Sequence, residues 1–441
     1  MNEIISNNKD IMETIQNIYK NAQPEDLRKL IAKHLMPTIE EKKKFAEIPT
    51  PVSLVDEMLE KIPSVFWTKP KTVLEPCCGK GNFVIGIFDK LYEGMKEHKS
   101  NKVERCELIV TNCLYYGDIT DLNVFTTTEL LKCHIKSKTG QEEINYEFNS
   151  YVGDTLDEKF TNAFKIKKFD AVIGNPPYNK SKDGVLKGGY GGRSLWDKFV
   201  EKALEGQMVE NGYLLYVHPP SWRKPEHYLW KKMSSKQILY IKSYSEQESS
   251  KIFGCATTVD YYLLKNTKVY EETEFYGQDK RTSLLDLRKW GFLPSGCIDE
   301  IKKILGKNEV IYSSSIYDTR KKYISTVENV EYMLPVVHSM TQKNGVGFVY
   351  SKEDKGQFNV PKVILSLGRH QYPYNDWKGE YGMSNVCFGL HIGSKEDGDN
   401  IVKAINSEKF KEIVKYTKWS TFQTDWRMFK GFKQDFWKEF V

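Results

Sequence analysis

The sequence lacks long apolar runs, paired cysteines and a secretory leader. No stretch of 18 apolar residues occurs, whereas a membrane helix needs about 20, so no membrane association is expected. The N-terminus, MNEIISNNKDIMETIQ, has neither the basic start nor the apolar run of a signal peptide, which predicts a cytoplasmic protein. The eight cysteines form no Cys-x-x-Cys pair, so we expect neither a metal site nor a disulfide framework.

Arginine is scarce, and the net charge of +6 is modest for 441 residues. The excess lies toward the C-terminus, where residues 301–441 hold 22 Lys and Arg against 16 Asp and Glu. A basic C-terminal third is typical of proteins that meet a polyanion. Ordinary surface charge explains the same numbers equally well, so charge alone does not indicate a function.

The chain is too long for one core, and its patterns predict three segments. Residues 1–45 have the apolar spacing of an N-terminal helical segment. In residues 46–270 short apolar strands, one including Leu108–Val110, alternate with helical stretches, which predicts an α/β, mostly parallel, doubly wound sheet. Residues 271–441 predict an α+β domain with long loops and one helix at Asp399–Tyr416.

A glycine-rich turn follows the first strand of the expected sheet, in the run Glu75-Pro76-Cys77-Cys78-Gly79-Lys80-Gly81. Glycines at 79 and 81 allow a tight turn and a close approach of a ligand to the backbone. Val84 replaces the third glycine of the G-x-G-x-x-G fingerprint, so a plain strand–helix turn is the more common explanation. Glu75 suits a ligand that carries a cationic group.

Two further acids stand where the next strands end. Asp118 occupies the position at which a carboxylate binds a ribose diol, and helix capping is an equally good explanation. Asp154, in Val152-Gly153-Asp154-Thr155, can accept a hydrogen bond from an exocyclic amine, or it can cap a helix or stabilise the local turn. Ligands of such sheets bind at the carboxyl ends of the strands, so these acids are expected near one another.

The most specific signal is the run from Phe169 to Tyr178, in which a buried strand leads directly into Asn175-Pro176-Pro177-Tyr178. Two consecutive prolines fix the backbone and remove two N–H donors. Rigid carbonyl groups then lie beside the Asn175 side chain, and Tyr178 offers a ring for stacking. Such a cluster is suited to accept hydrogen bonds from one planar –NH2 group, and it is an unusual choice for a simple turn.

Asn175-Pro176-Pro177-Tyr178, preceded by Glu75 to Phe83, resembles the catalytic and cofactor motifs of S-adenosyl-L-methionine-dependent amino-methyltransferases. The order of the motifs is similar to that of the γ group of N6-adenine DNA methyltransferases of restriction–modification type. This resemblance implies a Rossmann-like doubly wound catalytic domain at residues 46–270 and an α+β target-recognition domain at residues 271–441. It also implies a bacterial, phage or viral origin.

The resemblance assigns a role to each matching position. The residues that it implies for S-adenosyl-L-methionine are Thr50, Pro51, Glu75, Pro76, Cys77, Gly79, Gly81, Asp118, Ile119, Asp154, Thr155 and Asn175. Within this set, Thr50 is expected at the cofactor carboxylate, Asp118 at the ribose, Ile119 against the adenine and Asp154 at the adenine amine.

A target adenine must leave the duplex before its amino group can react. The resemblance places Asn175, Pro176, Pro177 and Tyr178 around that base, and Phe253 on its other face, where a core aromatic is an equally good explanation. The glycine-rich segment after the motif carries Lys180, Lys182, Lys187 and Arg193, and we expect these cations at DNA phosphates unless the segment is only a solvated loop. Duplex DNA is therefore the expected partner, and the protein is expected to act as a monomer.

Other functions stay open. Asn-Pro-Pro-Tyr also serves methylation of RNA bases and of protein glutamine amides, by enzymes that usually lack a large C-terminal domain. Cytosine-N4 methyltransferases more often carry Ser at the position of Asn175. A non-catalytic nucleic-acid-binding subunit is disfavoured, because both halves of the site are intact. The sequence leaves open whether a separate cognate restriction endonuclease accompanies the protein.

Overall fold

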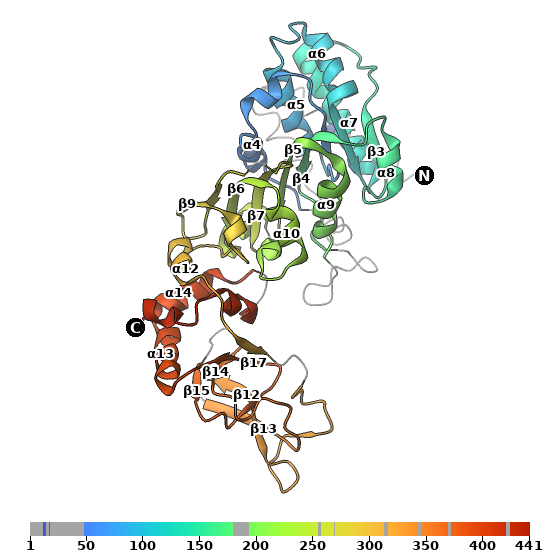
Figure 1. Ribbon diagram of the computed structural model, residues 1–441. Helices are drawn as coiled ribbons and strands as arrows, with labels where there is room; N and C mark the ends of the chain where they lie inside the picture. Colours follow the sequence, from blue (N-terminus) through green and yellow to red (C-terminus); the bar gives the residue numbers. More distant parts are fainter. Residues whose placement is uncertain are drawn as a thin grey trace. The chain divides into compact units, whose positions relative to one another are not determined.

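The computed structural model describes residues 12–14, 17, 48–179, 194–254, 257–268, 270–312, 316–341, 345–368, 372–419 and 424–441 (Figure 1). Almost all of the predicted N-terminal helical segment therefore lies outside the described residues. The same is true of the cationic segment with Lys180, Lys182, Lys187 and Arg193. Among the described residues no helix is long and apolar enough to cross a membrane.

The chain divides into two compact units. The first runs to Pro220 and adds Lys231–Phe275 and Leu284–Leu287, and the second holds Ser221–Trp230, Tyr276–Ser283 and Arg288–Val441. The chain changes from the first unit to the second near residue 275, and the boundary expected at residue 270 stays a prediction. The ten residues after Pro220 belong to the second unit, and no local pattern predicts this.

The first unit is built on a mixed sheet of nine strands in the order β3-β2-β1-β4-β5-β7-β6-β8-β9. Strands β1 to β5 pair in parallel, whereas β7 is antiparallel to both β5 and β6. The bounds in chain order are β1 Val73–Glu75, β2 Leu114–Asp118, β3 Asn149–Val152, β4 Phe169–Gly174, β5 Met208–His218, β6 Gln237–Tyr244, β7 Val259–Lys265, β8 Thr273–Tyr276 and β9 Thr282–Leu285. The predicted α/β fold is confirmed.

Chain direction explains where this sheet can bind a ligand. After β1 the chain adds β2 and β3 on one side and returns to place β4 and β5 on the other side. The connections therefore diverge between β1 and β4, and such a switch point opens a crevice at the carboxyl ends of the strands. β4 supplies a rigid wall for this crevice, because Ala171, Val172 and Ile173 are fully buried.

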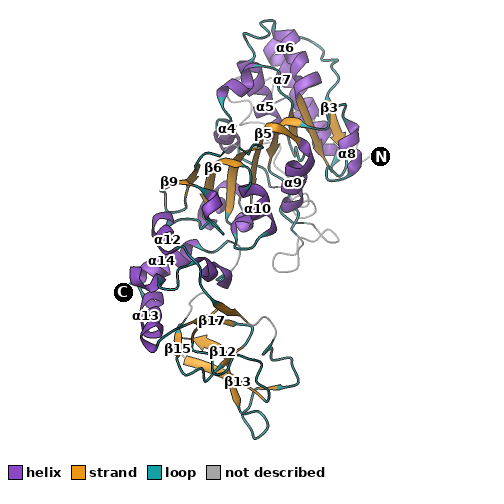
Figure 2. Cartoon of the chain, in the orientation of Figure 1, coloured by secondary structure: helices purple, strands orange, loops and turns teal. Residues whose placement is uncertain are grey.

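Helices flank the strands of the first unit (Figure 2). Their bounds are α4 Val52–Leu59, α5 Asn82–Gly94, α6 Lys102–Leu108, α7 Asp121–Thr139, α8 Glu158–Ala163, α9 Trp196–Lys202, α10 Tyr228–Ser234 and α11 Glu246–Phe253. α4 begins after Pro51 and buries one apolar face through Leu54, Val55, Met58 and Leu59. On its other side, Glu57 accepts hydrogen bonds from Lys242 and Tyr261, at 2.6 and 2.7 Å, so α4 is fixed to β6 and β7.

Two predicted elements are wrong. Leu108–Val110 is helical: α6 ends at Leu108, a wide π turn covers Ile109–Cys113, and β2 begins only at Leu114. Ile109 and Val110 are buried, and a short apolar run does not distinguish a buried strand from a buried helical turn. The single helix expected at Asp399–Tyr416 is two helices, α13 Lys395–Asn406 and α14 Glu408–Tyr416, because Ser407 is extended and caps α14 at the Phe410 N–H.

The second unit contains two four-stranded sheets, with the orders β10-β17-β14-β15 and β11-β13-β12-β16. The strands are β10 Val310–Tyr312, β11 Ile324–Ser325, β12 Leu334–Thr341, β13 Gly345–Ser351, β14 Lys362–Ser366, β15 Tyr374–Asp376, β16 Gly382–Met383 and β17 Cys387–His391, and the remaining helix is α12 Ile298–Ile304. Phe410, Phe429, Phe432 and Phe436 are fully buried, so the aromatic residues near the C-terminus form a core.

Candidate active site

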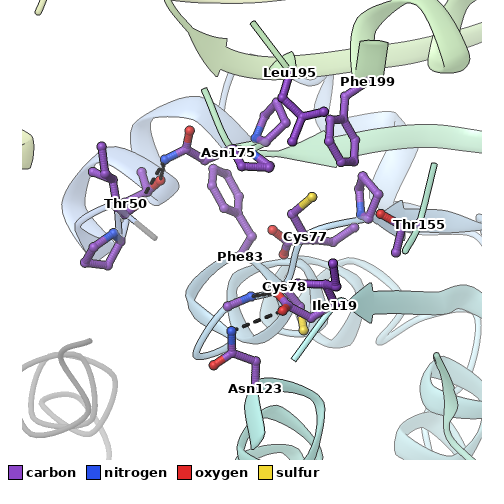
Figure 3. Close-up of a pocket in the computed structure, with 18 of the residues that line it drawn as sticks. Thr50, Cys77, Cys78, Phe83, Ile119, Asn123, Thr155, Asn175, Leu195 and Phe199 are labelled. Carbon is purple, nitrogen blue, oxygen red and sulfur yellow. Dashed lines mark hydrogen bonds between the residues drawn. The ribbon is translucent and has the colours of Figure 1, made fainter. Parts of the chain in front are cut away.

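One cavity of about 490 Å³ opens at the carboxyl ends of β1 to β4 (Figure 3). The turns after these strands, the first residues of α5 and α7, the segment before α4 and the start of α9 supply its wall. The described lining residues are Ile48, Pro49, Thr50, Glu75, Pro76, Cys77, Cys78, Gly79, Lys80, Asn82, Phe83, Asp118, Ile119, Asn123, Asp154, Thr155, Leu156, Asn175, Pro176, Pro177, Tyr178, Asn179, Leu195 and Phe199. The volume suits a ligand of nucleoside size.

The turn after β1 depends on its glycines. Gly79 and Gly81 have φ angles of 49° and 88°, in the left-handed region that disfavours other residues. A Cβ atom at Gly81 would also meet the Thr127 hydroxyl at 3.1 Å. The Gly79 N–H donates to Asp118 Oδ2 at 3.0 Å, so the turn is held to the end of β2.

Asp118 serves the local backbone as well as the cavity. Its Oδ1 accepts hydrogen bonds from the Thr120 N–H at 2.9 Å and from the Asn123 amide at 3.2 Å. Burial raises the pKa of this carboxyl although these hydrogen bonds oppose the rise. Asp118 therefore both accepts hydrogen bonds from the local backbone and lines the cavity. Its contact with a ribose stays a prediction.

Glu75 adds a second carboxyl to the cavity wall. It is 1% exposed, and no described residue donates a hydrogen bond to its Oε2. Burial, reinforced by the charge of Asp118, raises the pKa of Glu75 well above its ordinary value. Two buried carboxyls, one of them with an oxygen that no described residue donates to, favour a positively charged ligand, because such a ligand would offset their desolvation.

Apolar side chains line the opposite part of the cavity. Ile119 is 60% exposed, which is unusual for an isoleucine in a concave site, and Leu156, Leu195 and Phe199 contribute further apolar surface. Asp154 is exposed beside them, and its Oδ1 accepts from the Leu156 N–H at 2.9 Å. This part of the cavity can hold a flat ring system with one polar edge.

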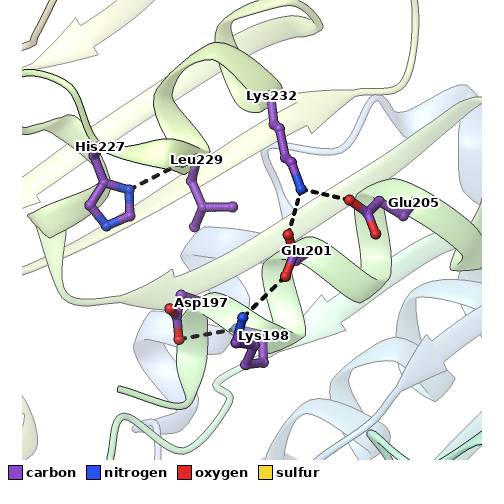
Figure 4. Close-up of polar contacts among 7 residues, drawn as sticks. All are labelled: Asp197, Lys198, Glu201, Glu205, His227, Leu229 and Lys232. Atoms are coloured by element: carbon purple, nitrogen blue, oxygen red, sulfur yellow. Dashed lines mark hydrogen bonds and ion pairs between the residues drawn. The ribbon is translucent and has the colours of Figure 1, made fainter. Parts of the chain in front are cut away.

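Helix α9, which carries Phe199, is fixed on its outer side by charge (Figure 4). Lys232 on α10 lies between Glu201 and Glu205, with N–O distances of 2.5 and 2.6 Å, and Lys198 contacts Glu201 at 3.3 Å. The hydrogen bonds from Lys232 and Lys198 lower the pKa of Glu201. These contacts hold the helix from outside while Phe199 faces the cavity.

Asn175 follows β4 directly, and its amide is fixed by the segment before α4. Its Nδ2 donates to the Ile48 carbonyl at 3.0 Å and to the Thr50 hydroxyl at 3.1 Å. Both amide hydrogens are thereby used. The Asn175 Oδ1 is buried, and no described residue donates to it. Figure 3 shows the nitrogen turned toward Thr50 and the oxygen directed away from it.

Most of the residues implied for the site come together in the cavity wall. The implied positions that do not line the cavity, among those described, are Pro51, Gly81 and Phe253. Pro51 and Gly81 precede α4 and α5 and shape the backbone beside the cavity. Phe253 is the half-buried last residue of α11, so its contact with a target base stays a prediction.

Several lining residues were not anticipated. Asn82 and Phe83 belong to the glycine-rich motif and had a local signal in their position after Gly81. Leu195 and Phe199 had none, because they lie at the N-cap of α9 and within α9, a helix that begins 18 residues after Tyr178. No group of three or more His, Cys, Asp and Glu suited to a metal ion occurs in the described part of the chain.

The middle of the chain matches a known protein family. Residues 99–253 match the family model of the Eco57I restriction-modification methylases. This segment, less than half of the chain, is similar to that family. The match includes Asp118, Asp154 and Asn175 to Tyr178, so the resemblance stated from the motifs is confirmed there. An uncharacterized adenine-specific methylase of Mycoplasma pneumoniae is 34% identical over 135 residues, which are 31% of this chain and 28% of that protein.

Solved structures extend the likeness in fold beyond the methylase segment. The ATP-dependent Type ISP restriction-modification enzyme LlaBIII matches with a TM-score of 0.53 and 11% identity, over 91% of this chain and 40% of that one. The Type ISP enzyme LlaGI matches with a TM-score of 0.51 and 13% identity, over 91% and 47%. The chain thus spans less than half of these enzymes and about a quarter of the curated relative.

Proposed function

We propose that this protein is an S-adenosyl-L-methionine-dependent DNA methyltransferase that modifies the N6 amino group of adenine in duplex DNA. The observation that carries the proposal is the Asn175 amide, whose two hydrogens are used and whose buried oxygen lacks a described donor. An acceptor held in this way needs an N–H group from a substrate, and an exocyclic amine supplies one.

The cavity fits the proposed cofactor in charge and shape. S-adenosyl-L-methionine supplies a methyl group on a sulfonium centre, and it carries a second positive charge on its amino group. Glu75 and Asp118 would lie near these charges, with Asp118 also in reach of a ribose. Ile119, Leu156 and Phe199 would pack around an adenine ring, and Asp154 would accept from its amine.

The chain's own residues would act mainly by positioning. Tyr178 would stack on the extruded base, and the Asn175 oxygen together with the Pro176 carbonyl would accept hydrogen bonds from N6. These acceptors would hold the amine so that its lone pair faces the methyl group. No strong base is required in this scheme, because orientation and fixed dipoles supply most of the rate.

Duplex DNA is the proposed substrate for two reasons. The curated relative is named as adenine-specific, and the LlaBIII enzyme of similar fold is bound to DNA. The second unit holds all of residues 301–441, which carry 22 Lys and Arg against 16 Asp and Glu. We propose that this unit reads the target sequence.

The test is transfer of a tritiated methyl group from S-adenosyl-L-methionine to duplex DNA, RNA and protein in parallel reactions. Label in DNA that digests to N6-methyladenine supports the proposal. Label only in RNA or protein would replace it with the alternative reading of the same motif. An Asn175→Ala variant provides the control for contaminating activity.

A further inference from the structure

The Asn175 amide is joined to the cofactor turn by a short chain of hydrogen bonds that passes through Thr50. At one end, the Asn82 Nδ2, on the first residue of α5, donates to the Thr50 carbonyl at 2.9 Å. At the other end, the Asn175 Nδ2 donates to the Thr50 hydroxyl at 3.1 Å. Three segments that are distant in sequence therefore meet at one residue.

The amide orientation depends on this chain. If the Asn175 side chain were rotated by 180°, its oxygen would face the Ile48 carbonyl and the hydrogen bond to that carbonyl would be lost, whereas the Thr50 hydroxyl would have to turn from acceptor to donor to keep its own bond. The Thr50 side chain is only 4% exposed, so water is poorly placed to replace its hydroxyl. The segment itself is held by α4, whose Glu57 is bonded to Lys242 and Tyr261.

We propose that Thr50 and Asn82 are positioning residues that keep the Asn175 oxygen available to the amine of the substrate. Thr50 acts directly on the amide, and Asn82 acts through the Thr50 backbone. The inference rests on the proposed function, and it differs from the expectation that the Thr50 hydroxyl serves the carboxylate of the cofactor. It also means that a ligand on the Gly79–Asn82 turn influences the orientation of the catalytic amide.

Thr50→Val tests the inference, because it removes the hydroxyl, keeps the side-chain shape and leaves the backbone carbonyl for Asn82. The rate of a single turnover at saturating cofactor is expected to fall roughly tenfold, the equivalent of one lost hydrogen bond. Affinity for S-adenosylhomocysteine, measured by calorimetry without DNA, should be unchanged. Thr50→Ser should restore the rate, since it restores the acceptor.

Thr273→Val is the matched control. Thr273 is fully buried in the same unit, and its hydroxyl bonds to the Ile238 carbonyl, away from the cavity. This variant should keep the wild-type rate. The inference is overturned if Thr50→Val weakens S-adenosylhomocysteine binding and leaves the saturated rate intact, because the hydroxyl would then serve the cofactor and not the amide.

A spectroscopic measurement separates this inference from the proposed function. In protein labelled with 15N-asparagine, the side-chain resonances of Asn175 are identified by their loss in Asn175→Ala. Thr50→Val should shift one of the two amide protons, and Asn82→Ala should shift them although Asn82 does not bond to Asn175. Unchanged resonances in both variants contradict the inference, whereas an absence of methyl transfer by the wild-type protein contradicts only the proposed function.

Discussion

Replacing Asn175 by alanine removes the acceptor on which the proposed chemistry depends. Loss of one preorganised polar group at a reacting centre costs about 100- to 1,000-fold in rate, and Asn175→Ala is expected to fall in that range. The variant also leaves the Ile48 carbonyl and the Thr50 hydroxyl without their donor. An unsatisfied buried group costs about 1–3 kcal/mol, so the free energy of unfolding should drop by a similar amount.

The assay compares single-turnover methyl transfer with S-adenosylhomocysteine affinity in the same preparation. The single-turnover rate should fall by the factor given above. The affinity for S-adenosylhomocysteine should change by less than about threefold, which is a smaller change than the loss of one hydrogen bond would cause. Asn266→Ala is the control, because its Nδ2 donates to the Val209 carbonyl at 3.0 Å outside the cavity wall. It should lower stability and keep the rate. Substantial activity in Asn175→Ala, or a parallel loss of cofactor affinity, would refute the reasoning.

Three further predictions concern the turn, the pH dependence and the second unit. Gly81→Ala forces a Cβ into the left-handed region and against Thr127, so it should cost more than about 1 kcal/mol of stability and weaken S-adenosylhomocysteine in calorimetry. The pKa of Asp89 is lowered from 3.8 to about 2, because its hydrogen bond and ion pairs outweigh burial. Ionised Asp89 therefore contributes about 2 kcal/mol to the free energy of unfolding above pH 3.8, and this contribution is lost as the pH falls through 2. In urea unfolding, Asp89→Asn should destabilise the protein at pH 6 and should do so less at pH 2. Lys362 and Asp376 form a fully buried ion pair at 2.8 Å. Lys362→Met leaves the Asp376 carboxylate buried without its partner, so it should destabilise the second unit by about 3–5 kcal/mol in thermal unfolding. Adding Asp376→Leu should recover part of that loss.

Much of the first unit could be predicted from sequence, because strand ends and turn chemistry are local. Asp118 ends β2, Gly79 and Asn175 follow β1 and β4, and the carboxyl ends of these parallel strands meet at one edge. The sequence therefore predicts that the residues on these turns lie together.

The rest depends on contacts that leave no local pattern. The bond from Asn175 to Thr50 joins residues 125 positions apart, and only the docking of α4 on the sheet brings them together. Phe253 shows a further limit: it is the last residue of α11, and the direction of its side chain could not be predicted from the sequence. The strand predicted at Leu108–Val110 is wrong because apolar composition does not specify backbone conformation over three residues.

The central claim is that the Asn175 oxygen accepts the amino group of an adenine in DNA. The most direct measurement is transfer of tritiated methyl groups to unmethylated duplex DNA by wild-type protein, followed by nucleoside analysis. The account predicts label in N6-methyladenine alone, with none for Asn175→Ala. Label in cytosine, in RNA or in protein, or N6-methyladenine formed equally well by Asn175→Ala, would contradict it.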